Sequence, residues 1–190
     1  MRLVLVILLI AAAIWVFILG FRNQKRISYF GIFVILIPAG VLGYFEYTWQ
    51  VAQQNIAAVV QSITKDPETS FECQRMSFGF FDAEAGEKAV TSNEKKVELK
   101  YTSCAALLAW YSSEEKNKPS EEQIGAIHLF TKETMRVAGQ ADEALQECLA
   151  VKNDAAVVQK LGGSEAVGQY ISLYYQQNVA DQTPERRVYC

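Results

Sequence analysis

The sequence is poor in histidine, and His128 is the only one among its 190 residues. A Ser–His or Cys–His nucleophile system would therefore have to use this residue. The sequence also lacks a G-x-S-x-G turn, a phosphate-binding loop and a glycine-rich dinucleotide turn, so it has no motif of the enzymes that depend on them. Its four cysteines include no C-x-x-C pair, which argues against a structural zinc site.

Charge is missing from two apolar stretches near the N-terminus, residues 3–20 and 27–44. Each is long enough to cross the hydrocarbon core of a bilayer. The segment between them, 21–26, contains three basic residues and no acidic one, which places it in the cytoplasm. We therefore predict two transmembrane helices within residues 1–48, with the rest of the chain on the extracytoplasmic side of the cytoplasmic membrane. No ionisable residue lies in the middle of either stretch, which argues against a channel or transporter.

A cleaved signal peptide is the alternative explanation for residues 1–20. Its basic region would consist of Arg2 alone, and no small-x-small cleavage site follows the apolar run. Both features favour retention of this segment as a transmembrane helix.

The remainder of the chain is predicted to form a helical stem, residues 49–66, and one extracytoplasmic domain, residues 67–190. All four cysteines lie in this domain, and an even number in an oxidising compartment indicates two disulfides, for which three pairings exist. Residues 71–81 and 96–103 have strand-like patterns on either side of a polar turn, so we expect a small antiparallel β-hairpin. Such a hairpin would bring Cys73 close to Cys104, and Cys148–Cys190 follows by elimination.

Helical patterns dominate the rest of the domain. We expect helices over residues 105–111, from Ser120 to about residue 137, over 141–161, and from Ser164 to about residue 178. Ser120 and Gln123 form a capping-box signal, and Gly139 and the Gly162–Gly163 pair mark helix ends. The predicted fold class is therefore α+β and mainly helical.

Residues 126–151 read AIHLFTKETMRVAGQADEALQECLAV. This stretch resembles an actinobacterial family of membrane-tethered extracytoplasmic HExxH (zincin-like) proteins, whose helix reads roughly A-V-H-V-L-T-H-E-A-M-H and is followed by an acidic D/N-E-A-x-x-E-C helix. The resemblance covers about residues 71–190 and not the two apolar stretches. It implies a zincin-like helical domain, in which two histidines one helical turn apart bind zinc and the glutamate beside them acts as general base.

In this sequence the family's five motif positions are Lys132, Glu133, two intervening residues and Arg136. The resemblance implies that the general-base position survives as Glu133, that Lys132 and Arg136 occupy the two former histidine ligand positions, and that Glu143 or Glu147 occupies the third. Protonated Lys and Arg have no lone pair for a metal, so we expect a pseudoenzyme that binds neither metal nor cofactor. We hypothesise that the two cations form ion pairs with these glutamates; the alternative is a solvated helix face.

These observations predict a non-catalytic, membrane-anchored accessory or scaffolding protein, with the integral membrane proteins of a larger respiratory or envelope complex as partners. The competing hypothesis is an active extracytoplasmic metallopeptidase or other hydrolase with an atypical site formed by His128, Glu133 and Glu147. A third possibility is a plain tethered structural domain. The domain is mildly acidic, which argues against a nucleic-acid partner, and we expect no small-molecule substrate.

Overall fold

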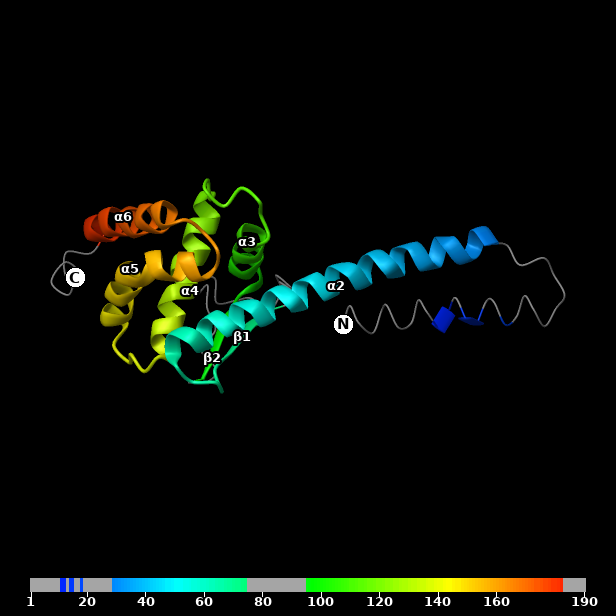
Figure 1. Ribbon diagram of the computed structural model, residues 1–190, viewed down its shortest axis with the longest axis horizontal. Helices are drawn as coiled ribbons and strands as arrows, with labels where there is room; N and C mark the ends of the chain where they lie inside the picture. The colour runs from blue at the N-terminus through cyan, green and yellow to red at the C-terminus, as the bar shows by residue number, and fades with distance from the viewer. Residues whose placement is uncertain (1–10, 13, 16–17, 19–28, 75–94, 183–190) are drawn as a thin grey trace. The chain divides into compact units, whose positions relative to one another are not determined.

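The computed structural model describes residues 11–12, 14–15, 18, 29–74 and 95–182, without the side chains of residues 29–35 and 178–182. The chain divides into two units, residues 1–51 and residues 52–190, and helix α2 contains residues of both. The elements follow in the order α2 (Tyr29–Thr64), β1 (Ser70–Cys73), β2 (Lys96–Leu99), α3 (Tyr101–Tyr111), α4 (Glu121–Val137), α5 (Glu143–Lys160) and α6 (Glu165–Gln182) (Figure 1). The prediction of a mainly helical fold with a two-stranded sheet is confirmed.

The first unit is described mainly by the N-terminal half of α2. Apolar and aromatic side chains there are exposed, among them Ile37, Tyr44 and Tyr47, each at least 60% exposed. In the part of the chain that the structure describes, no helix combines the length and the hydrophobicity needed to cross a membrane. Most of the first predicted span, residues 3–20, lies outside the described residues.

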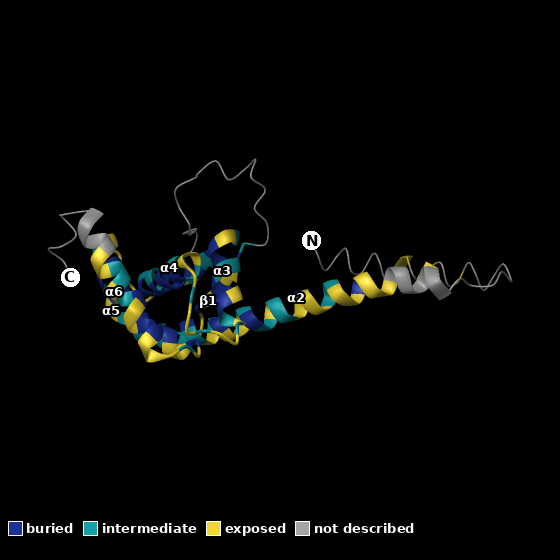
Figure 2. Ribbon diagram, turned by 90° about the horizontal axis from the view of Figure 1, so that it is seen from above, coloured by how far each residue is buried: buried dark blue, intermediate teal, exposed yellow. Residues whose placement is uncertain are grey.

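The second unit has a helical core. Helix α4 packs between α3 and α5, α6 packs on α5, and β2 contacts α4. Buried residues are concentrated in this unit (Figure 2), and its largest fully buried side chains are Trp110, Phe130, Ile56, Leu99, Leu107, Ile127, Leu161 and Ile171. Ile56 lies in the segment predicted to be a stem. Residues 52–64 of α2 are therefore part of the folded domain.

The helix ends follow local sequence signals. Ser120 and Gln123 form the predicted capping box at the start of α4, with both reciprocal hydrogen bonds present. The carboxylate of Asp142 accepts a hydrogen bond from the main-chain N–H of Leu145 and caps α5. Gly139 has a positive φ of 101°, a conformation that glycine adopts without strain, and so α4 ends where the sequence predicts.

The predicted antiparallel hairpin is wrong, because β1 and β2 pair in parallel, with Ser70 opposite Lys96 and Cys73 opposite Leu99. A parallel pair needs a connection of about a dozen residues or more, and residues 74–95 provide one. The strands are also shorter than predicted. Residues 75–81 lie outside the described residues, and 101–103 form the first turn of α3.

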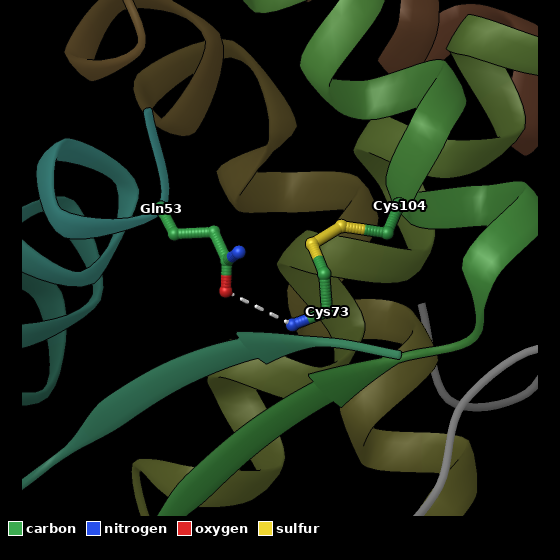
Figure 3. Close-up of a disulfide and its surroundings, with 3 residues drawn as sticks. All are labelled: Gln53, Cys73 and Cys104. Carbon is green, nitrogen blue, oxygen red and sulfur yellow. Dashed lines mark hydrogen bonds between the residues drawn. A yellow bond between two sulfur atoms is a disulfide. The ribbon is translucent and has the colours of Figure 1, made fainter. Parts of the chain in front are cut away.

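The Cys73–Cys104 disulfide is present, although the geometry that joins the two residues differs from the predicted hairpin. Cys73 ends β1, and Cys104 lies in the first turn of α3 directly after β2, so both cysteines lie at the same end of the parallel pair (Figure 3). The side-chain oxygen of Gln53 in α2 accepts a hydrogen bond from the main-chain N–H of Cys73. Cys148 is also disulfide-bonded, and its predicted partner Cys190 lies outside the described residues.

Candidate functional site

The sequence-predicted site residues lie on two neighbouring helices. Lys132, Glu133 and Arg136 are on α4, and Glu143 and Glu147 are on α5. Residues four apart share a helix face, so Lys132 and Arg136 form one stripe on α4, and the two α5 glutamates form another. Because α4 packs against α5, the charged side chains of the two helices meet. We refer to His128, Lys132, Glu143, Glu147 and Asp154 as the charged cluster.

Lys132 links the two α5 glutamates. Its ammonium lies 3.1 Å from a carboxylate oxygen of Glu143 and 3.2 Å from one of Glu147, and its side chain is only 17% exposed. Burial works against the charge of Lys132, but the two carboxylates outweigh burial and raise its pKa. The ion pairs that we hypothesised for this residue are present, and a fully solvated helix face is wrong here.

Arg136 pairs with a different partner. Its Nε donates to Glu133 Oε2 at 2.8 Å, and its Nη2 donates to the main-chain oxygen of Lys96 at 2.9 Å. Both side chains of the pair are mostly buried. Arg136 therefore neutralises Glu133 within α4 and also joins this helix to strand β2.

The centre of the charged cluster is His128, the only histidine of the sequence. Its ring is buried, with Nδ1 at 2.8 Å from Asp154 Oδ2 and Nε2 at 2.8 Å from Glu147 Oε1. Burial opposes protonation, but the two carboxylates outweigh it and raise the pKa of His128 to about 9. At neutral pH the ring is therefore an imidazolium that donates one hydrogen bond to each carboxylate.

The pKa of Glu147 changes in the opposite direction. Burial raises the pKa of Glu147, but hydrogen bonds and charge from His128 and Lys132 outweigh it and lower the pKa to about 2. Asp154 is fully buried, and its Oδ1 has no hydrogen-bond partner among the described residues. Among the described residues, the imidazolium of His128 is thus the charged partner of this buried side chain.

Sequence reasoning missed Asp154 and Tyr175. The aromatic ring of Tyr175 from α6 stacks on the imidazole, with ring centroids 3.6 Å apart and an angle of 14° between the planes. Burial, followed by the nearby negative charge of Asp154, raises the pKa of Tyr175, so the phenol stays protonated. The spacing between Glu147 and Asp154 carried a signal, since seven residues is two helical turns and places both carboxylates on one face of α5.

Both cations of the cluster are paired with its carboxylates. Both nitrogens of the imidazolium carry protons, and the ammonium of Lys132 is a donor only, so neither side chain offers a lone pair to a metal. Across the described ranges, no three His, Cys, Asp or Glu side chains gather in a way that could hold a metal ion. Of the atypical site that we considered, His128 and Glu147 are in direct contact, whereas Glu133 is bound to Arg136.

In comparisons with protein-family models, with curated proteins and with solved structures, nothing matches this chain. The resemblance to the HExxH proteins therefore remains a prediction, and the functional argument depends on the geometry of the cluster itself.

Proposed function

We propose that the protein is a non-catalytic accessory or scaffolding protein anchored in the cytoplasmic membrane, with a degenerate zincin-like domain on the extracytoplasmic side. In this proposal Lys132 and Arg136 replace a metal ion as the positive charges among buried glutamates. The domain is retained for its shape, and it acts by binding other integral membrane proteins of a larger complex, such as a respiratory or envelope complex.

One observation carries the proposal: both ring nitrogens of His128 are 2.8 Å from carboxylate oxygens. A general base needs an accessible nitrogen lone pair, and a catalytic zinc site needs three protein ligands with an open position. An imidazolium held between Glu147 and Asp154 fulfils neither need. The same ion pairs join α4 to α5, and so they contribute to the packing of the two helices.

Membrane attachment is supported by the first unit. Residues 36–47 expose large apolar side chains, and the sequence of residues 27–44 has no charge. Exposed apolar surface of this kind is characteristic of contact with lipid or with another membrane protein. The disulfides support an extracytoplasmic position, because such bonds persist in oxidising compartments.

The test is elemental analysis for zinc on the detergent-purified full chain, beside the double variant Lys132→His, Arg136→His. We expect the parent to bind no zinc and the variant, which restores two imidazoles one turn apart, to bind about one zinc per chain. A double variant Lys132→Gln, Arg136→Gln removes the same two charges without supplying ligands, and it should remain free of zinc. Stoichiometric zinc in the parent would overturn the proposal and call for hydrolase assays.

A further inference from the structure

A groove of about 720 Å³ lies between α3 and the first half of α4. Its walls are formed largely by the small residues Ala105, Ala106 and Ala109 from α3 and Gly125 and Ala126 from α4. None of these residues belongs to the charged cluster, so the groove is a separate feature of the domain. Small side chains on both walls allow the main chain of another segment to approach closely.

Ser103 places an unpaired polar group in this groove. The residue is only 8% exposed, yet it lines the groove, and its hydroxyl forms no hydrogen bond with another described residue. The hydroxyl is not one of the fully enclosed side-chain atoms that lack a partner, so it is accessible from the open space of the groove. The hydroxyl is therefore available to a polar atom of an occupant.

The rim of the groove is negatively charged. Glu121 and Glu122 line it from the first turn of α4, and neither forms an ion pair with a Lys or Arg in the described part of the chain. The carboxylate of Glu121 is held in place by a hydrogen bond of 3.1 Å from the hydroxyl of Tyr174. The described residues that line the groove include two carboxylates and no cation, so the groove is complementary to a basic partner.

We propose that this groove binds a helical segment of a partner protein that carries Lys or Arg. The inference rests on the proposed function, and it names the surface through which the accessory domain binds its partner. The alanine and glycine walls admit a closely packed third helix, the hydroxyl of Ser103 bonds to a polar atom of that helix, and Glu121 and Glu122 pair with its basic side chains.

The test is site-specific photocrosslinking of the full chain in its native membrane. A benzoylphenylalanine in place of Ala109, which is exposed in the groove, is compared with one at Ala156, which is exposed on α5. We expect crosslinking from position 109 alone, and peptide mapping should place the crosslink in a helical partner segment that contains Lys or Arg. Adding Glu122→Lys should reduce the yield about tenfold, because it places like charges together, and Ser103→Ala should reduce it several-fold.

Three results would overturn this inference: no crosslink from position 109, a crosslink within the chain or to a second copy of it, or a partner segment without a basic residue. An additional probe at Val41, which is exposed in the first unit, separates this inference from the proposed function. Crosslinks from position 41 to another membrane protein, without any from position 109, would reject the groove and leave the accessory role intact. No crosslink from either position would reject both.

Discussion

Raising the pH from 6.5 to 9 should destabilise the folded domain, because it removes the proton that allows His128 to donate to two carboxylates. The ordinary pKa of histidine is 6.5, and the folded protein raises it to about 9. A group with a raised pKa stabilises the folded state fully below its unfolded pKa, and this contribution disappears as the pH rises through the folded pKa. At ~1.4 kcal/mol per pH unit, the loss is roughly 3 kcal/mol of unfolding free energy.

At acidic pH the dependence has the opposite sign, because the unfolding free energy decreases as the pH falls. Glu147 has a pKa lowered to about 2, so its contribution is present above its ordinary value of 4.5 and disappears as the pH falls toward 2. The same ion pair with His128 underlies both changes, so the two contributions are not added together. The domain should therefore be most stable between about pH 4.5 and 6.5.

Urea denaturation of the full chain in detergent measures this effect. Trp110 is buried in the domain, and its fluorescence reports unfolding once Trp15 and Trp49 are replaced by phenylalanine. His128 is the only histidine, and none of the described cysteines is free, so few other groups titrate in this range. His128→Gln is the control, because its unfolding free energy should be lower but nearly constant from pH 6.5 to 9. A parent protein whose stability does not change over this range would refute the reasoning.

Two substitutions test other parts of the packing. Arg136→Met removes the partner of a mostly buried glutamate and a hydrogen bond to β2, and it should lower the unfolding free energy by roughly 3 kcal/mol in the same urea assay. Gly168→Ala places a Cβ against the main chain of Ala155, forcing α5 and α6 apart, and it should lower the melting temperature by an amount that corresponds to roughly 1–3 kcal/mol.

Each of these substitutions has a matched control in the same domain. Lys152→Met removes an exposed cation from α5, and its effect should stay within about 0.5 kcal/mol. Gly125→Ala adds a Cβ whose nearest neighbour, the hydroxyl of Tyr175, is 3.5 Å away, an ordinary contact. If Gly168→Ala were as stable as Gly125→Ala, the close contact between α5 and α6 would be wrong.

The sequence predicts helix ends well, because the signals are local. The capping box of Ser120 and Gln123, and the positive φ of Gly139 and Gly162, act within a few residues of the ends that they define. The direction of the strands, in contrast, is not determined by local signals. Whether β1 and β2 are parallel depends on the path of the long connection between them, which the pattern within each strand does not record.

The charged cluster was predictable only in part. Pairing between the cations of α4 and the glutamates of α5 followed from charge balance, since buried carboxylates need compensation. The role of His128 did not follow, because a lone histidine on an apolar helix face is usually a packing residue. Its environment depends on Asp154 and Tyr175, which are brought to it by the packing of α5 and α6 and not by proximity in sequence.

The most direct test of the account is the protonation state of His128 at neutral pH. Nitrogen NMR of the full chain labelled with ¹⁵N-histidine gives one unambiguous signal set, because the sequence contains one histidine. If Glu147 and Asp154 hold an imidazolium, both ring nitrogens will carry protons at about pH 7.5, a full unit above the ordinary pKa of the side chain. A neutral ring with one unprotonated nitrogen at that pH would contradict the central claim that His128 is a cation paired with Glu147 and Asp154.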